Sequence, residues 1–217
     1  MSNVLKMLLA GAAPNGPSMS AWGRGTEGQL GDGTAVSKSS PVLVGALTTW
    51  SSVAPGAYHS ITTKTDGTLW AWGSGAHGRL GDGTTVSKSS PIQVGALTTW
   101  MNVAAGYFQS IATKTDGTLW AWGGNSSGQL GDGTTADKSS PIQVGALTTW
   151  SKVSSGWHHT LATKTDGTLW AWGLNATGQL GDGTTVNKSS PIQVGALTTW
   201  SNMAGGRYHS IATVALP

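Results

Sequence analysis

The chain repeats itself every 50 residues. The phrase Ala-Leu-Thr-Thr-Trp ends at Trp50, Trp100, Trp150 and Trp200, so the period holds without drift. A fixed period of this size is typical of propellers, solenoids and other arrays, in which each unit buries its apolar surface against the next. Between 66–100 and 116–150, the positions that differ are 74–77, 79, 86 and 87. The fold is therefore expected to consist of nearly identical units, and the positions that vary carry the information about function.

Each unit has the pattern of four short strands joined by glycine-rich turns. In the first complete unit the expected strands are 50–54, 59–63, 68–72 and 91–94. Asp66-Gly67 separates the second from the third and predicts a two-residue hairpin with a type I′ turn. Period-2 alternation places Trp70 and Trp72 on one face of the third strand. Pro91 suits an outer edge strand because it has no N–H to donate. Radial repetition of such four-stranded antiparallel meanders is an all-β propeller.

The repeats divide the chain into a leader, 1–17, and a propeller, 18–217. The propeller is expected to consist of a half blade at 18–46, blades at 47–96, 97–146 and 147–196, and a half blade at 197–217. The first half blade carries the last two strands of a unit and the second carries the first two, so together they would complete a fourth blade. The short apolar leader is interpreted as a docking arm, and the alternatives are a signal peptide cleaved near Ala13 and a segment that covers the split blade.

Composition excludes several classes of function. The chain has no cysteine, which excludes disulfides, thiolate zinc sites, iron–sulfur clusters and cysteine nucleophiles. The formal net charge of +3 comes from scattered residues, with no basic run suited to a nucleic-acid backbone. No apolar stretch approaches the roughly 18 residues that span a bilayer. We therefore expect no nucleic-acid partner, no membrane span, no metal and no cofactor.

The repeated motifs resemble a known family. Leu-Trp-Ala-Trp-Gly, Gly-Gln-Leu-Gly-Asp-Gly-Thr, Pro-Ile-Gln-Val and Trp-x-x-Val-x-x-Gly-x-x-His-Ser are similar to regulator-of-chromosome-condensation repeats, and they recur over about 200 residues. The resemblance implies a β-propeller, which in that family usually has seven blades. The family includes nucleotide-exchange factors, chromatin binders and inhibitor-like propellers, so the resemblance predicts the fold and leaves the function open.

Three chemical motifs have structural explanations. The glycine patterns at 23–28 and 73–78 spell a dinucleotide fingerprint but open no helix, so turns are expected there. The Gly-Asp-Gly-Thr loops at 31, 81, 131 and 181 offer one carboxylate each, too few for calcium, and predict Asx turns. His59, His159 and His209 share one repeat position, where a structural hydrogen bond is expected. No nucleophile–base pair or carboxylate dyad appears, and we expect no enzymatic activity.

The variable positions are expected to share one end of the propeller. If the first strand of each blade runs upward, the loops at 57–59 and 74–77, with their equivalents in other blades, lie on the upper face. Rigid scaffolds often carry binding groups on such loops, although drift at exposed loop tips is the alternative explanation. We expect these aromatic side chains to be partly accessible and Trp70, Trp120 and Trp170 to be buried. The candidate binding residues are Tyr58, His59, Tyr107, Phe108, Trp157, His158, Arg207, Tyr208, Arg24, Glu27, His77, Asn125 and Asn175.

The function expected from these observations is a non-enzymatic scaffold for assembly or recognition. A virion surface component, with the leader docking into a larger assembly, is one form. A secreted lectin-like or inhibitor-like module is the other, with a protein or a glycan bound on the upper face. A virion or extracellular location follows from these two forms, and a cytoplasmic one stays open. Two chains that exchange half blades would make an eight-bladed ring, and a four-bladed monomer is the competing arrangement.

Overall fold

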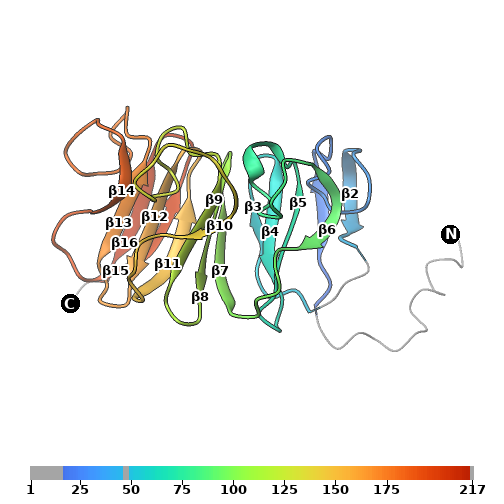
Figure 1. Ribbon diagram of the computed structural model, residues 1–217, viewed down its shortest axis with the longest axis horizontal. Coiled ribbons are helices and arrows are strands. Elements are labelled where there is room, and N and C mark those ends of the chain that lie inside the picture. The colour runs from blue at the N-terminus through green and yellow to red at the C-terminus, as the bar shows by residue number, and fades with distance from the viewer. Residues whose placement is uncertain (1–16, 46–48, 216–217) are drawn as a thin grey trace, which may run out of the picture.

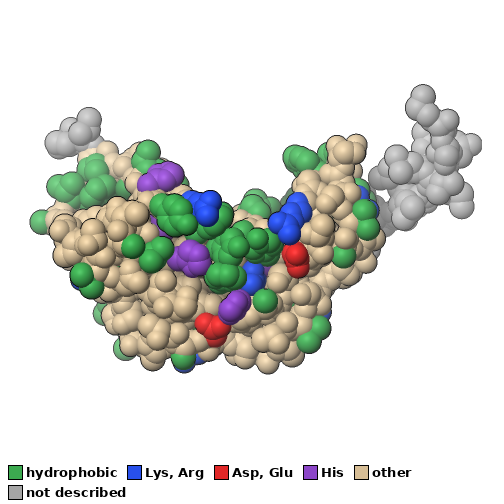
Figure 2. All heavy atoms as spheres, turned by 90° about the horizontal axis from the view of Figure 1, so that it is seen from above, with side chains coloured by type: hydrophobic (Ala, Val, Ile, Leu, Met, Phe, Trp, Pro, Cys, Tyr) green, Lys and Arg blue, Asp and Glu red, His purple; other side chains and the backbone are tan. Residues whose placement is uncertain are grey.

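The sheets of the protein stand side by side along an arc. The computed structural model describes residues 17–45 and 49–215, so the leader, apart from Pro17, lies outside the described residues. Five antiparallel sheets follow each other in chain order from one end of the long axis to the other (Figure 1). Viewed from above, the molecule is a crescent (Figure 2). Among the described residues, no helix is long and apolar enough to span a membrane.

Three of the sheets are complete four-stranded blades. The first contains β3 (Ala54–Pro55), β4 (His59–Thr63), β5 (Leu69–Gly73) and β6 (Lys88–Gln93), and the short 3₁₀ helix η1 (Ala76–Gly78) follows β5. The second contains β7 (Trp100–Ala105), β8 (Gln109–Lys114), β9 (Leu119–Gly123) and β10 (Lys138–Gln143). The third contains β11 (Trp150–Ser155), β12 (His159–Lys164), β13 (Leu169–Gly173) and β14 (Lys188–Gln193). In each blade, sequential strands are neighbours, which is the expected meander.

The two half blades lie at opposite ends of the arc. One is the pair β1 (Ser20–Gly23) and β2 (Lys38–Leu43), and the other is the pair β15 (Trp200–Gly205) and β16 (Ser210–Val214). Each forms a separate two-stranded sheet, and among the described residues the two half blades do not pair with each other. The two ends of the crescent lie apart (Figure 2).

The outer strand of each blade begins earlier than expected. β6 starts at Lys88, and its pairing with β5 is interrupted between Gly73↔Lys88 and Ala71↔Ile92. Pro91 lies inside this interruption, where a residue without an N–H costs no ladder bond. The innermost strand of the first blade, β3, is shorter than expected, and Trp50 forms only an isolated bridge with Lys64.

The Asp-Gly hairpins are three-residue loops and not the expected type I′ turns. Gly67 has a φ of +76°, but Asp66 is not among the residues with positive φ, which a type I′ turn would require. The Gly67 N–H donates to the Lys64 carbonyl at 2.9 Å, and the Lys64 N–H donates to the Thr68 carbonyl at 3.0 Å. This is a type I turn followed by a left-handed glycine, a common three-residue hairpin loop.

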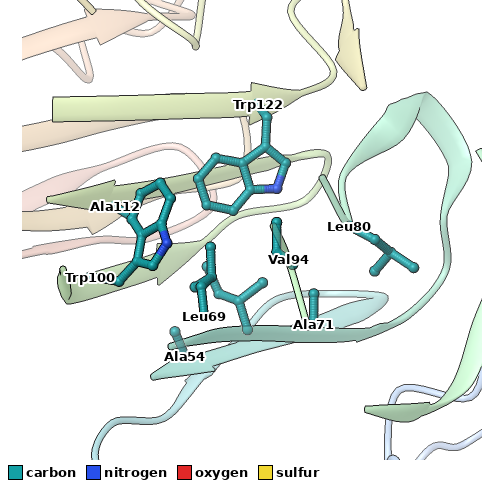
Figure 3. Close-up of a cluster of buried hydrophobic side chains, with 9 residues drawn as sticks. Ala54, Leu69, Ala71, Leu80, Val94, Trp100, Ala112 and Trp122 are labelled. Atoms are coloured by element: carbon teal, nitrogen blue, oxygen red, sulfur yellow. The ribbon is translucent and has the colours of Figure 1, made fainter. Parts of the chain in front are cut away.

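The core consists of layers between neighbouring blades. Leu69 and Ala71 of β5 face the next blade, where they pack against Trp100 and Trp122 (Figure 3). Trp122 is fully buried, and its indole Nε1 donates across the blade boundary to the Arg79 carbonyl at 2.9 Å. The boundary between the second and third blades repeats this arrangement with Trp150 and Trp172 in the tryptophan positions. Each blade thus presents an aliphatic face to the next blade and a tryptophan face to the previous one.

The outer tryptophan of each third strand is only half-buried. Trp70, Trp120 and Trp170 were expected to be buried, but each lies at the rim of its layer beneath a lysine. The Lys114 ammonium sits 3.5 Å from the centroid of Trp120, and Lys164 stands equally close to Trp170. The lysine ammonium lies over the ring in a cation–π contact and covers part of it, in keeping with its intermediate exposure.

Candidate functional site

The two variable segments of each repeat meet on one end of the blades, which we call the upper face. The backbone N–H of Ser74 donates to the Tyr58 carbonyl at 2.8 Å, so the loop after β5 rests on the loop before β4. Across the blade boundary, the ring of His77 packs on Phe108 with centroids 4.7 Å apart. The expected placement of both variable sets on one face is therefore confirmed.

Aromatic rings run along this face from blade to blade. We call Tyr58, Tyr107, Trp157 and Tyr208 the aromatic row. The centroid distances are 5.0 Å from Tyr58 to Tyr107, 4.6 Å from Tyr107 to Trp157 and 6.3 Å from Trp157 to Tyr208. The two tyrosine hydroxyls are also hydrogen-bonded at 3.1 Å. Figure 2 shows hydrophobic side chains gathered along the inner curve of the crescent.

Hydrogen bonds between successive loops hold the row in place. The Tyr107 N–H donates to the Trp157 carbonyl at 3.1 Å, and the Trp157 N–H donates to the Gly206 carbonyl at 3.2 Å. A glycine precedes each of these loops because the neighbouring backbone leaves no room for a side chain. A Cβ on Gly156 would lie 2.5 Å from the Gly206 carbonyl oxygen. The spacing of the aromatic rings is therefore set by the backbone of adjacent blades.

Cationic side chains stand over the aromatic row. The Arg207 guanidinium lies 3.8 Å from the centroid of Trp157, and Arg24 lies 5.0 Å from that of Tyr58. Arg24 is paired with Glu27 at 3.5 Å, whereas Arg207 has no ion pair among the described residues. His158 is half-buried beside Tyr107, and its burial, followed by the charge of Arg207, lowers its pKa. The face thus carries a free positive charge above an aromatic surface.

Arg79 is part of this site and was missed by the sequence reasoning. Its side chain is 2% exposed, its Nη1 donates to the Tyr107 carbonyl at 3.0 Å, and its guanidinium lies 4.9 Å from the centroid of Phe108. It stands where the other repeats have glutamine, within a motif that was interpreted as purely structural. The difference at position 79 was itself the signal that could have identified it.

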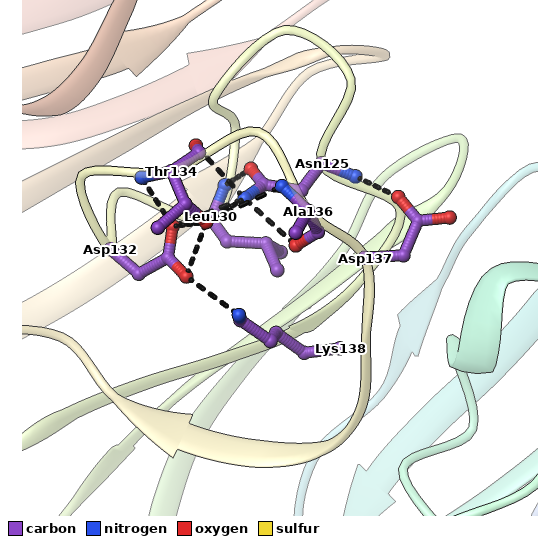
Figure 4. A network of polar contacts seen from close by, with 7 residues as sticks. All are labelled: Asn125, Leu130, Asp132, Thr134, Ala136, Asp137 and Lys138. Carbon is purple, nitrogen blue, oxygen red and sulfur yellow. Dashed lines mark hydrogen bonds and ion pairs between the residues drawn. The ribbon is translucent and has the colours of Figure 1, made fainter.

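Three candidate binding residues are buried and do not belong to the upper face. His59 is 0% exposed, and its Nε2 shares a hydrogen bond of 2.8 Å with the Ser110 hydroxyl of the next blade. Asn125 and Asn175 are also fully buried and so do not lie on the exposed face where they were expected. The Asn125 amide bonds Asp132 and the carbonyls of the surrounding loop, while its Oδ1 accepts from the Leu130 N–H (Figure 4). The asparagines stabilise their loops, and His59 joins neighbouring blades.

The remaining candidates lie on the upper face. Arg207 and Tyr208 are among the exposed ones. The half-buried ones include Tyr58, Tyr107, Phe108, Trp157 and His158. Exposure alone does not set these aromatics apart, because the rim tryptophans at the opposite end are half-buried too. What distinguishes the upper face is that its rings contact each other across blades. His77 joins this face through Phe108, and its Nδ1 shares a hydrogen bond of 2.7 Å with the Asp137 carboxylate.

The structural explanations of two motifs are confirmed. In the Gly-Asp-Gly-Thr loop at 131–134, Asp132 Oδ1 accepts hydrogen bonds from both the N–H and the hydroxyl of Thr134. This is the expected Asx turn, and Lys138 adds an ion pair at 3.4 Å. The histidine position also forms its expected bond between blades, since His159 Nε2 contacts the Ser210 hydroxyl at 3.0 Å.

Comparison with known proteins assigns the chain to a family. The model of the regulator of chromosome condensation (RCC1) repeat matches four segments, 21–62, 66–113, 116–163 and 166–213. These segments cover most of the chain. The chain belongs to the RCC1 repeat family. A second model of the same repeat matches 102–129 and 150–179. A search of curated proteins finds no match to the chain.

Solved structures show the same fold. Prp20p from Saccharomyces cerevisiae, in a study of its binding to Gsp1p and histones, is 21% identical with a TM-score of 0.80, covering 89% of this chain and 50% of its own. Human WBSCR16 is 22% identical with a TM-score of 0.83, covering 93% and 54%. Yeast RCC1 (Prp20) bound to Kap60 is 21% identical with a TM-score of 0.80, covering 91% and 50%. The RCC1-type propeller fold is thus established, and the chain spans about half the length of these relatives.

Proposed function

We propose that this RCC1-repeat chain is a non-enzymatic scaffold that binds a protein partner on its upper face. The observation that carries the proposal is the aromatic row, in which rings from successive blades contact each other without interruption from Tyr58 to Tyr208. Half-buried, rigidly held aromatic side chains and arginines are the residue types that contribute most to protein–protein binding. An extended segment of a partner would cross the blades along this row.

The charges on the face favour an acidic segment. Arg207 is exposed and has no carboxylate partner among the described residues, and Arg79 adds a second positive charge beneath Phe108. The acidic residues Glu27 and Asp137 already have partners, since Glu27 pairs with Arg24 and Asp137 shares a hydrogen bond with His77. A partner segment with carboxylates beside aromatic or aliphatic side chains would complement both features.

Protein binding also agrees with what is known of the solved relatives. Prp20p was studied for its binding to Gsp1p and histones, and its structure with Kap60 is known. The virion and secreted roles, and the location that each implies, are narrower proposals. Both rest on the leader, of which residues 1–16 lie outside the described residues. The upper face supports the scaffold role in either setting.

A displayed library of random peptides, selected on the immobilised protein, tests the proposal. We expect enrichment of peptides that combine acidic and aromatic residues. Trp157→Ala, which removes the centre of the aromatic row, should weaken binding of an enriched peptide at least about tenfold, as expected for a central anchor. Arg79→Gln removes one positive charge and introduces the residue that the other repeats carry at this position. It should weaken binding while leaving the melting temperature nearly unchanged.

Val86→Ser serves as the control, since Val86 is an exposed apolar residue that takes no part in the aromatic row. It should bind the same peptides as the unaltered chain. Peptides that bind Trp157→Ala as tightly as the unaltered chain would contradict the proposal. Binding of neutral glycans on a glycan array, with no peptide selected from the library, would indicate that the ligand is a sugar and not a protein.

A further inference from the structure

The two half blades are complementary to each other strand by strand. In the first complete blade, β4 pairs with β5 in the register Ser60↔Trp72 and Ile61↔Ala71, and the other complete blades repeat this register. β16 is the counterpart of β4 in the repeat, and β1 is the counterpart of β5. Among the described residues, β16 pairs only with β15, and β1 pairs only with β2. Each half blade therefore exposes the edge that the other would cover.

The apolar residues at these edges are exposed only in the half blades. Trp22 is 63% exposed, whereas its counterparts Trp72 and Trp122 are 2% and 0% exposed. Ile211 is 65% exposed, whereas its counterpart Ile61 is 1% exposed. Large apolar side chains gathered at an unpaired sheet edge are characteristic of surfaces that are covered by another strand.

An open cavity lies at the C-terminal end of the arc, beside β16. It measures about 350 Å³, and Leu180, Val194 and Ile211 are among its lining residues. At the complete boundary, the corresponding space holds Trp122, which packs against Leu80 and Val94.

The surroundings of equivalent glycines also differ between the complete boundaries and the C-terminal end of the arc. A Cβ on Gly81 would lie 2.7 Å from the indole nitrogen of Trp122, and Gly131 has the same relation to Trp172. At Gly181 the nearest atom is a methyl of Val194 at 3.4 Å, and no indole is present. Among the described residues, no indole therefore fills the position that Trp122 and Trp172 take at the complete boundaries.

The opposite end of the arc has a matching cavity of about 420 Å³. Its lining includes Ala21, Trp22, Ile61 and Trp72, and it lies where the first two strands of the half blade are missing. At the complete boundary, Ile61 belongs to the cluster that contains Trp100 and Trp122. An isoleucine on a strand beside β1 would reach Trp72 in the same way.

We propose that two copies of the chain close into one ring by pairing β16 of each copy with β1 of the other. Three complete blades from each copy and two composite blades make an eight-bladed propeller. The register follows from the complete blades and places Ser210 opposite Trp22 and Ile211 opposite Ala21. The indole of Trp22 from a second copy enters the cavity beside Leu180, and its Nε1 donates to the Gln179 carbonyl, as Trp172 donates to Gln129 at 3.0 Å.

Other contacts that repeat at every complete boundary would also be satisfied. The N–H groups of Gly83 and Gly133 donate to the Ser139 and Ser189 carbonyls at 2.9 Å and 2.8 Å. The equivalent N–H of Gly183 has no such bond among the described residues. Ser39 of a second copy occupies the required repeat position.

The geometry selects a second copy over closure of one chain on itself. The half blades lie at opposite ends of the long axis (Figure 1), and the arc covers half the length of relatives to which it is similar at TM-scores of 0.80 and above. A four-bladed ring needs a step of about 90° between blades, and an eight-bladed ring needs about 45°. The exchange is isologous and leaves no free edge, so assembly stops at two chains.

Light scattering on the purified 217-residue chain at micromolar concentration tests the proposal. We expect a mass of twice the 22.1 kDa of one chain. Ile211→Asp should return the mass to that of a single chain without unfolding it, because Ile211 is exposed in the isolated chain. Val186→Asp is the matched control. Its counterpart Val86 stays 58% exposed beside a complete boundary, so this change should leave the dimer intact.

Cysteine pairing tests the register and separates the two kinds of closure. The chain has no cysteine of its own, so Ala212→Cys with Ser20→Cys introduces one opposed pair. Oxidation should yield a covalent dimer. Ala212→Cys with Ala21→Cys, whose side chains would lie on opposite faces, should yield much less. A single-chain mass for the unaltered protein, an internal disulfide within one chain, or masses above the dimer would each overturn the proposal.

Discussion

Buried histidines at the blade boundaries make the stability of the fold depend on pH. His59 bonds the Ser110 hydroxyl in a fully buried site, and burial, followed by the charge of Arg79, lowers its pKa from 6.5 to about 3. Burial similarly lowers the pKa of His159 to about 4. Both rings are therefore neutral in the folded chain at pH 5, where the unfolded chain binds protons on them.

The stability of the fold should fall as the pH drops below about 6.5. At pH 5, His59 alone disfavours the folded state by about 2 kcal/mol relative to neutral pH. His59→Gln introduces the residue that the second repeat carries at Gln109. The melting temperature of this variant should decrease less than that of the unaltered chain between about pH 7 and pH 5. Parallel curves over this range would contradict the assignment.

The aspartates of the Asp-Gly hairpins titrate in a separate pH range. Hydrogen bonds from Thr118 lower the pKa of Asp116 below its usual 3.8, and those from Thr68 do the same for Asp66. Their contribution to stability is present above that value and is lost only at still lower pH. Loss of stability between pH 6.5 and 4 therefore reports on the histidines.

At the scale of the element, the hairpin between the second and third strands is tied to the next linker. Gly117 has a φ of +76°, and the Trp150 N–H donates to its carbonyl at 3.0 Å. A Cβ on Gly117 would lie 2.1 Å from the Thr148 carbonyl oxygen. The glycine thus serves both the left-handed turn and the close passage of the chain that leads into the following blade.

Gly117→Ala, like the bulkier Gly117→Val, should destabilise the protein by more than its backbone conformation alone requires. The left-handed conformation costs about 1 kcal/mol for a residue with a Cβ, and displacement of the Thr148 backbone adds to this. Gly145→Ala is the control, because Gly145 has a φ of +64° and nothing within 4 Å of its Cβ position. Urea denaturation should show a clearly larger loss for Gly117→Ala than for Gly145→Ala. Equal losses would contradict the role of the linker contact.

The repeat period and the tryptophan alternation were sufficient to predict the blades and the end that carries the variable loops. The alternation of Trp70 and Trp72 with Leu69 describes the two packing faces of β5 directly. Burial of Asn125 could not be predicted, because the groups that satisfy its amide are carbonyls of a loop whose path has no local signal. The openness of the arc depends on the angle between packed sheets, which near-identical repeats do not encode in any single residue.

At the scale of the whole molecule, stability is expected to decrease from the centre of the arc toward its ends. The middle blade, β7–β10, has a neighbour on both sides, whereas β1–β2 and β15–β16 are two-stranded sheets with one face uncovered. Two-stranded sheets are marginal on their own, so the half blades depend on their single boundary.

Hydrogen exchange should reveal this gradient in a chain kept single by Ile211→Asp. Amides of β16 should exchange on the order of 100-fold faster than those of β8, since local opening is easiest where few apolar contacts are lost. In the unaltered protein the same β16 amides should be protected to nearly the level of β8. Fast exchange of β16 in both proteins would show that its outer edge stays uncovered.

The uniformity of the blade boundaries has a consequence for how such a protein changes over time. Each boundary uses the same indole-to-carbonyl bond, as Trp122 makes with Arg79 and Trp172 makes with Gln129. A unit gained or lost by unequal recombination would therefore meet neighbours that already fit it. The number of blades in a ring then depends on the angle between adjacent blades and on the number of repeats. A larger ring can therefore form without a new kind of blade boundary.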